Sequence, residues 1–266
     1  MDKECLNSET PNHKSDYIPL KFGNVFPNLW NVQNSDGNLA ICNVDGYVSF
    51  KINLLNANYL NRSIAGYPGI GYGVSGWNYE YKKQSSKIKF PLKVKKLLLK
   101  KIYVKSVSKI VDYEPNDLQH NITYDLWIKK KVEGAPGRND VEIMIQVFNK
   151  KLLPTGKLFY KDVLIPIGKK GSARRWNIFV GRSITGAFTV SFLINEKFDL
   201  NENIINLNDF INIFIKYFPD HNIDNYYIMG IEYGMEFGNS DLKNSKISFN
   251  INKMEIKRGI FNVKII

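Results

Sequence analysis

The sequence predicts an all-β fold, an antiparallel sandwich built around one core. Short segments of alternating apolar and polar residues recur between clusters of Gly, Asn, Asp and Pro, as strands and turns do in such sandwiches. Only one stretch has a clear helical period, whereas an α/β fold would alternate helices and strands throughout. The 266 residues, of which 44% are hydrophobic, are enough for one large β domain.

The first segment is expected to be a flexible tail over residues 1–17, followed by a single domain over residues 18–266. Residues 1–17 are rich in Lys, Asn, Ser, Thr, Asp and Glu and contain few apolar positions. The only two cysteines are Cys5, in this tail, and Cys42. They can form one disulfide that ties the tail to an early strand, or they can remain two free thiols.

Two later segments show the strand period most clearly. In residues 247–252, three apolar side chains alternate with Ser and Asn, which predicts a half-buried strand. Residues 141–147 read VEIMIQV, so that the Val and Ile side chains point to one side of a strand. Glu142, Met144 and Gln146 then point together to the other side.

The single helix is predicted over residues 206–218, NLNDFINIFIKYF. Its apolar residues follow the i, i+3, i+4, i+7 stripe of an amphipathic helix. Asn206 can cap its first turn and Pro219 fits its end.

The charge balance is basic, because Lys and Arg (37) outnumber Asp and Glu (25). Many lysines fall within residues 87–109 and are interleaved with Val, Leu and Ile, which predicts solvated positions on surface strands rather than a nucleic-acid site. The three histidines lie far apart, without the spacing of metal ligands. No apolar run is long enough for a membrane span, and the polar start over residues 1–12 lacks the apolar stretch of a secretory signal.

Carboxylates on strand faces are the candidates for chemistry. Cleavage of a glycosidic bond needs one carboxylic acid and one carboxylate on opposite sides of the sugar. Glu142 qualifies, because it stands on the polar face of a strand whose other face is apolar. In residues 226–240, YYIMGIEYGMEFGNS, both Glu232 and Glu236 lie on one strand face, and alternation alone does not choose between them.

Several motifs together resemble glycoside hydrolase family 12, the endoglucanases and xyloglucanases. YDLW at residues 124–127 followed by VEIMI at residues 141–145 is similar to the central strand pair of that family, and GMEFG at residues 234–238 is similar to its acid/base segment. NLW, YPGIGYG and TVSFLI follow the family's order at residues 28–30, 67–73 and 189–194.

The resemblance implies a jelly-roll β-sandwich with a concave substrate cleft and one packed α-helix. It implies that Glu142 is the nucleophile, that Glu236 rather than Glu232 is the acid/base, and that Asp125 hydrogen-bonds the nucleophile. No metal or organic cofactor is implied.

Substrate contacts are expected from side chains around these carboxylates. Trp30 matches a tryptophan of the family's cleft, and Asn28 belongs to the same NLW motif. Trp127 shares a strand face with Asp125, which favours the cleft over the core. Met144 and Gln146 share the strand face of Glu142, although the family usually carries Trp where Gln146 stands. Trp77 and Trp176 lie in poorly matched stretches and are left out of the expected site.

The resulting hypothesis is a retaining endo-β-1,4-glucanase that acts as a monomer on β-glucan, with no nucleic-acid partner and no membrane insertion. A xylanase of the related jelly-roll family and a non-catalytic carbohydrate-binding jelly roll remain open as alternatives. The resemblance implies an extracellular protein, whereas the missing signal leaves a cytoplasmic one open.

Overall fold

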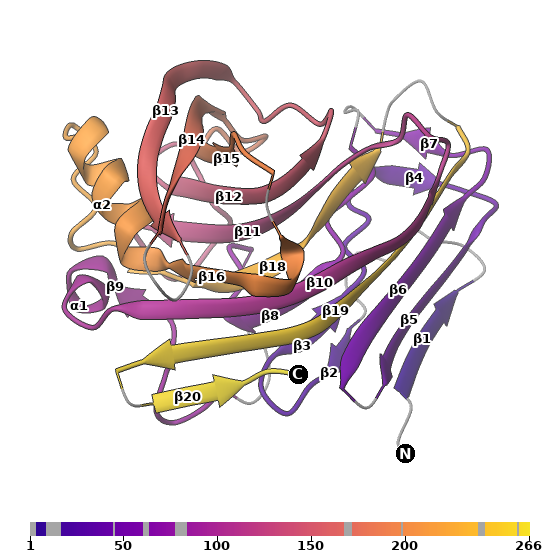
Figure 1. Ribbon diagram of the computed structural model, residues 1–266, viewed down its shortest axis with the longest axis horizontal. Coiled ribbons are helices and arrows are strands. Elements are labelled where there is room, and N and C mark those ends of the chain that lie inside the picture. The colour runs from indigo at the N-terminus through magenta and orange to yellow at the C-terminus, as the bar shows by residue number, and fades with distance from the viewer. Residues whose placement is uncertain are drawn as a thin grey trace.

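The structure is a computed structural model that describes residues 4–8, 17–44, 46–60, 64–77, 84–167, 172–197, 199–238, 243–259 and 261–266. Most of these residues form strands in two large sheets (Figure 1). The predicted all-β sandwich is confirmed.

The smaller sheet has seven strands. Its order is β1 (Glu4–Ser8), β5 (Asn38–Val44), β6 (Tyr47–Leu54), β19 (Ser245–Arg258), β10 (Ile102–Glu114) and β16 (Asn203–Asn206), and β20 (Phe261–Lys264) pairs with β19. All of these pairs are antiparallel.

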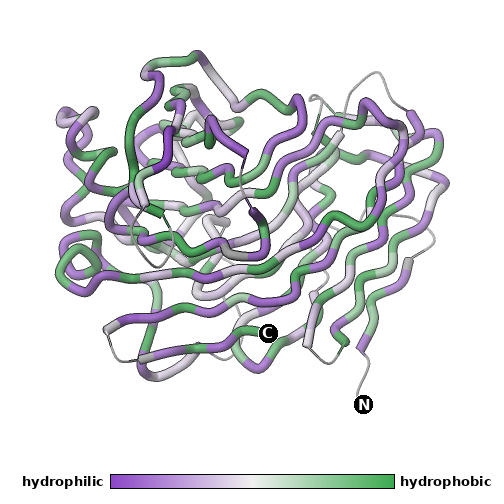
Figure 2. Tube along the Cα trace, in the orientation of Figure 1, coloured by the Kyte–Doolittle hydropathy of each residue, from purple (hydrophilic) through white to green (hydrophobic). Residues whose placement is uncertain are grey.

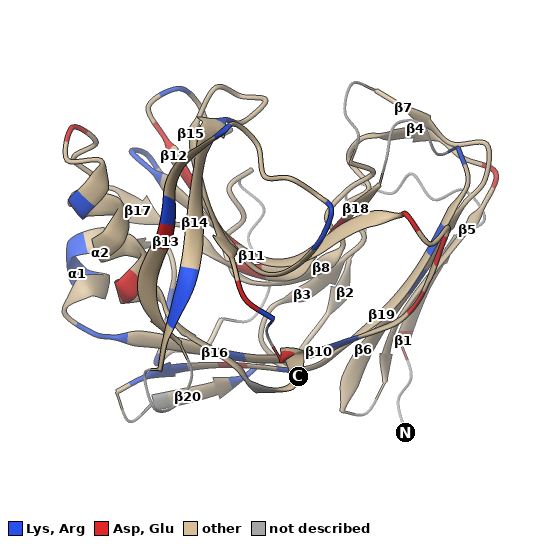
Figure 3. Cartoon of the chain, turned by 45° about the horizontal axis from the view of Figure 1, so that its top comes forward, with Lys and Arg blue, Asp and Glu red and all other residues tan. Residues whose placement is uncertain are grey.

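The larger sheet has eleven strands and curls strongly across its width (Figure 3). Its order is β13 (Lys157–Ile167), β14 (Ser172–Arg182), β15 (Phe188–Ile194), β12 (Val141–Lys150), β11 (Gln119–Lys129), β18 (Gly230–Gly238), β8 (Gly69–Gly73), β3 (Asn24–Phe26) and β2 (Ile18–Pro19). Two short strands, β17 (Tyr227–Ile228) and β9 (Leu92–Lys93), extend one side of it, and β4 (Val32–Asn34) pairs separately with β7 (Asn58–Tyr59). All its pairs are antiparallel except the parallel pair of β12 and β15.

One hydrophobic core lies between the two sheets and draws on nearly every strand of both. The alternation predicted for β12 and β19 is confirmed, since their apolar residues at every second position are at most 1% exposed: Val141, Ile143, Ile145, Val147, Ile247, Phe249 and Ile251. Along much of β19 the hydropathy alternates between neighbouring residues (Figure 2). The core therefore holds the opposite face of β12, which carries Glu142, in a fixed orientation.

The predicted helix is present as α2 (Leu207–Tyr217), and the Asn206 side chain accepts a hydrogen bond from the backbone N–H of Asn208, as an N-cap does. Its apolar stripe packs into the core, where Phe210 and Phe214 are fully buried. Phe210 meets Trp176 edge to face, with ring centroids 5.1 Å apart, so this tryptophan belongs to the core. None of the helices in the described part of the chain is long and apolar enough to cross a membrane.

Two regions differ from the sequence prediction. Residues 87–109 do not form only surface strands, because α1 (Val94–Leu98) lies among them and buries Val94 and Leu97. Val94 and Leu97 lie three residues apart, a spacing that puts both on one face of a helical turn but on opposite faces of a strand. The helices of the described chain are therefore α2, the five-residue α1 and the 3-10 turn η1 (Leu200–Glu202).

Part of the segment expected to be a tail lies in the fold. Glu4–Ser8 forms β1 at the edge of the smaller sheet, and Cys5 pairs directly with Cys42 on β5 in a disulfide. Residues 1–3 and 9–16 of that segment lie outside the described residues.

Candidate active site

Three neighbouring strands at the centre of the larger sheet, β12, β11 and β18, present a cluster of carboxyl groups on one face. The strand register fixes their relative positions: Glu142 lies opposite Trp127, Asp125 lies opposite Glu232, and Glu236 lies opposite Asn121. Acidic residues mark these strands at the curved centre of the sheet (Figure 3). Segments far apart in the sequence thus place four carboxyl groups on one strongly curved surface.

Glu142 is partly buried and its carboxylate has a fixed partner. The Thr189 hydroxyl, on the adjacent parallel strand β15, donates a hydrogen bond of 2.7 Å to Glu142 Oε2. Because the flanking residues Val141 and Ile143 are locked in the core, both the backbone and the carboxylate of Glu142 are held in position.

Asp125 and Glu232 are the most deeply buried acids of the cluster, each at 7% exposure. Burial, and then the negative charges of Glu142, Glu232 and Glu236, hold the pKa of Asp125 well above its usual value, against the opposing hydrogen bond from the Leu126 backbone. Asp125 Oδ1 is buried and has no hydrogen-bond partner among the described residues. A protonated Asp125 can donate to a neighbouring carboxylate, as expected of a group that supports a nucleophile.

Glu236 has a different environment. Asn121 Nδ2 donates a hydrogen bond of 2.6 Å to Glu236 Oε2, and Asn121 Oδ1 accepts one from the Glu236 backbone N–H at 3.1 Å. Burial raises the pKa of Glu236 to about 7, although the hydrogen bond from Asn121 acts to lower it. A carboxyl group with this pKa is available as a proton donor near neutral pH and can also accept a proton.

Glu232 shares the strand face of Glu236, as alternation predicted, and stands directly across from Asp125. The residues between and beside the two glutamates, Tyr233, Met235 and Phe237, are fully buried in the opposite direction. Both glutamates therefore belong to the carboxyl cluster, including Glu232, which strand alternation alone did not distinguish from Glu236.

The predicted substrate contacts differ in exposure. Asn28 and Trp30 are partly buried in the connection between β3 and β4, where the Asn28 carbonyl accepts a hydrogen bond from the Tyr67 backbone. This connection crosses Gly66, which bridges to Phe237 next to Glu236, so it lies at the Glu236 end of the cluster.

Met144 and Gln146 lie on the face of Glu142 but expose only 8% and 1% of their surface. Gln146 Oε1 accepts a hydrogen bond of 3.3 Å from Asn149, so its amide is at least partly engaged within the protein.

Trp127 is 5% exposed, which leaves little of its ring for a sugar. Instead it packs edge to face against Trp77, with ring centroids 6.2 Å apart, and Trp77 is 44% exposed. Trp77 was not among the predicted contacts, because its stretch matches the family poorly. The structure places it beside Trp127, the residue opposite Glu142.

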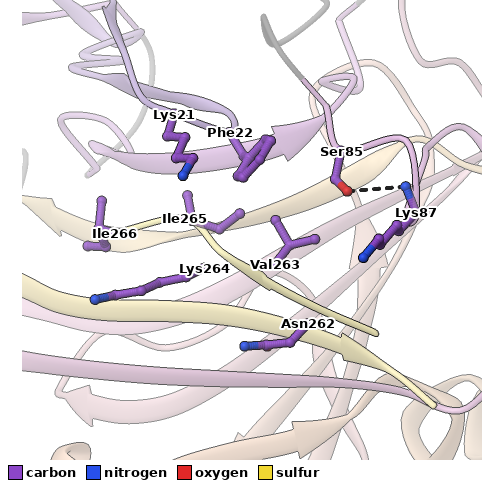
Figure 4. Close-up of a pocket in the computed structure, with 9 residues that line it drawn as sticks. All are labelled: Lys21, Phe22, Ser85, Lys87, Asn262, Val263, Lys264, Ile265 and Ile266. Atoms are coloured by element: carbon purple, nitrogen blue, oxygen red, sulfur yellow. Dashed lines mark hydrogen bonds between the residues drawn. The ribbon is translucent and has the colours of Figure 1, made fainter. Parts of the chain in front are cut away.

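A hollow of about 530 Å³ lies away from the carboxyl cluster, between β20 and the segments around Phe22 and Ser85 (Figure 4). Its polar groups include the amines of Lys21, Lys87 and Lys264, and it contains no carboxyl side chain. This hollow therefore lacks the groups that glycosidic cleavage needs.

The fold and the carboxyl cluster together define a class: a β-sandwich whose curved sheet presents acid, base and nucleophile candidates. The model of glycosyl hydrolase family 12 matches residues 23–255 of the chain. The chain belongs to glycosyl hydrolase family 12, and it is a glycoside hydrolase.

Solved structures of similar fold support this membership. A native family 12 xyloglucanase from Bacillus licheniformis superposes with a TM-score of 0.71 at 20% identity, over 94% of this chain and 99% of that one. Endoglucanase 3 from Trichoderma harzianum gives 0.63 at 13% identity, over 97% and 98%. The catalytic domain of Humicola grisea Cel12A, in complex with a soaked thio cellotetraose, gives 0.63 at 15% identity, over 94% and 98%. No curated protein sequence matches the chain.

Proposed function

We propose that the protein is a retaining endo-β-1,4-glucanase. In the first step Glu236 donates its proton to the glycosidic oxygen while a Glu142 carboxylate oxygen attacks the anomeric carbon, so that the glycosidic bond breaks and a glycosyl ester forms. In the second step Glu236 takes a proton from water, whose oxygen attacks the anomeric carbon and releases Glu142. The product keeps the β configuration.

The observation that carries this proposal is the contrast between the environments of the two glutamates. Burial raises the pKa of Glu236 to about 7, which suits a group that gives and then takes a proton. The carboxylate of Glu142 accepts a hydrogen bond from the Thr189 hydroxyl, which fixes its orientation for attack. We assign Asp125 as the partner of the nucleophile, because its raised pKa keeps a proton available for Glu142.

The substrate is proposed to be soluble β-1,4-glucan, with Asn28, Trp30, Trp127, Met144 and Gln146 as its predicted neighbours. The similar structures include both xyloglucanases and cellulases. Rates on carboxymethylcellulose, xyloglucan and xylan therefore separate the glucanase from a xyloglucanase and from a xylanase.

The assignment is tested by the release of reducing sugar from carboxymethylcellulose by purified variants. We expect Glu142→Gln and Glu236→Gln each to lose at least about 1000-fold in kcat, in line with the effect of removing a reacting group. Glu255→Gln is the matched control, because this partly buried glutamate pairs with Lys253 at 3.1 Å on the smaller sheet, and it should keep full activity.

Three results would overturn the assignment. Unchanged turnover by Glu142→Gln removes the proposed nucleophile. An inactive Glu232→Gln beside a fully active Glu236→Gln moves the acid/base role to Glu232. Binding of cello-oligosaccharides without turnover by the unmutated protein favours a carbohydrate-binding module.

The proposed setting is extracellular and the proposed state is monomeric. The disulfide between Cys5 and Cys42 supports the first, since such bonds persist mainly in oxidising compartments. Activity in the medium of the producing cells and the elution volume in size-exclusion chromatography test these two statements.

A further inference from the structure

The four tryptophans of the chain have very different exposures. Trp176 is fully buried and Trp127 is 5% exposed, whereas Trp30 is partly buried. Trp77 stands apart at 44% exposure. A large exposed aromatic ring beside a polar site commonly serves binding, because its apolar face gains from being covered by a ligand.

One side chain, that of Trp127, lies between Trp77 and the proposed nucleophile Glu142. Its ring meets that of Trp127 at 71°, with centroids 6.2 Å apart. Trp127 is the direct cross-strand neighbour of Glu142, and such neighbours have Cβ atoms about 5 Å apart. Trp77 is thus within reach of a sugar unit adjacent to the one that Glu142 attacks.

The segment that carries Trp77 is held firmly against Trp127. A Cβ atom at Gly76 would lie 2.2 Å from the Trp127 ring, so the backbone passes directly over the indole and only glycine fits. The Gly76 carbonyl accepts a hydrogen bond of 3.0 Å from Lys129 Nζ, whose side chain is buried at 1% exposure. The Trp77 backbone N–H donates to Ser75 Oγ at 3.2 Å.

The same buried lysine joins this segment to another loop. Lys129 Nζ also donates to the carbonyls of Val132 and Gly134. Removing a lysine from water is costly, and burial lowers its pKa, so these carbonyl contacts offset a real penalty. The Lys129 contacts hold the backbone around Trp77 in place before a ligand binds, which reduces the conformational entropy lost on binding.

We propose that Trp77 is a glycan-binding residue, on whose exposed indole a hexopyranose unit of the β-glucan stacks next to the unit attacked by Glu142. Trp127 and Gly76 form its rigid support. The ligand class is a β-linked hexose chain, whose ring faces present apolar C–H groups to an aromatic surface. This inference rests on the proposed glucanase function and adds a binding residue to it.

The test compares Trp77→Ala, Trp77→Phe and the unmutated enzyme on cellohexaose. We expect Trp77→Ala to lower kcat/KM by about three- to tenfold, mainly through KM, and to change which bonds of cellohexaose are cut, because one binding position is lost. Trp77→Phe keeps an aromatic surface and should retain most of the unmutated pattern. Tyr103→Ala removes a 39% exposed aromatic ring from β10 of the other sheet and should leave both readouts unchanged.

A merely structural role would lower the melting temperature and scale all cleavage rates together. An unchanged distribution of cleaved bonds in Trp77→Ala therefore overturns the inference, even if its stability falls. Lack of activity of the unmutated enzyme on every β-glucan overturns the proposed function and this inference with it.

Discussion

Removal of the Asn121 side chain should make the enzyme more active at alkaline pH. Asn121 Nδ2 donates to Glu236 Oε2 at 2.6 Å, and this bond stabilises the ionised carboxylate. In Asn121→Ala the ionised form loses that donor, so the pKa of Glu236 rises above its value of about 7. A hydrogen bond to a charged group contributes about 1.5–3 kcal/mol, and about 1.4 kcal/mol corresponds to one pH unit.

The lower end of that range applies, because Glu236 is only partly buried and water can replace the lost donor in part. We therefore expect the alkaline midpoint of kcat/KM, near pH 7 in the unmutated enzyme, to rise by about one pH unit. The sign follows from the chemistry: Glu236 must be protonated for the first step, so activity falls as pH rises through its pKa.

The assay is the pH profile of kcat/KM on a soluble β-glucan. Asn203→Ala is the matched control, because Asn203 is also a fully buried asparagine whose amide donates a hydrogen bond, to Ser106 Oγ at 3.1 Å on the other sheet. It should leave the midpoint in place. An Asn121→Ala midpoint that stays near pH 7 or moves down would refute the role assigned to this hydrogen bond.

Three further outcomes concern stability. Glu236→Gln should raise the free energy of unfolding by about 1–3 kcal/mol more at pH 8 than at pH 4, because a carboxyl whose pKa is raised to about 7 in the folded state destabilises the fold as pH rises through that pKa. Equal gains at both pH values in denaturant titrations would contradict this. Reduction of the disulfide between Cys5 and Cys42 should cost about 2–4 kcal/mol, seen as a lower melting temperature with dithiothreitol that a Cys5→Ser, Cys42→Ser double variant reproduces without it. Phe214→Ala, which empties a fully buried site in α2, should cost about 3–5 kcal/mol in urea unfolding, whereas Phe159→Ala, at a 56% exposed ring, should cost less than about 1 kcal/mol.

Periodicity was sufficient to predict the local structure around Glu142 and in α2. Alternation over seven residues fixed which side chains of β12 face the core, and the apolar stripe with Asn206 at its start located the helix to within a residue. Both signals are local, because they depend only on which side of one element is buried.

Contacts between distant strands were beyond such signals. Asn121 lies 115 positions before Glu236, and their pairing depends on the register of β11 and β18, which no local pattern specifies. The place of Glu232 across from Asp125 has the same origin. Trp77 lies past the end of β8, where no strand alternation predicts which way a side chain points. Its neighbour Trp127 was expected to be accessible, because alternation predicts the sheet face of a side chain but not whether another segment covers that face.

The central claim is tested most directly by the stereochemistry of hydrolysis, followed by proton NMR of the anomeric signals during the first minutes of a reaction with cellohexaose. A double displacement by Glu142 and Glu236 predicts that the new reducing end appears first as the β anomer and then equilibrates. Initial appearance of the α anomer would mean single displacement by water, and it would contradict the assignment of Glu142 as a nucleophile.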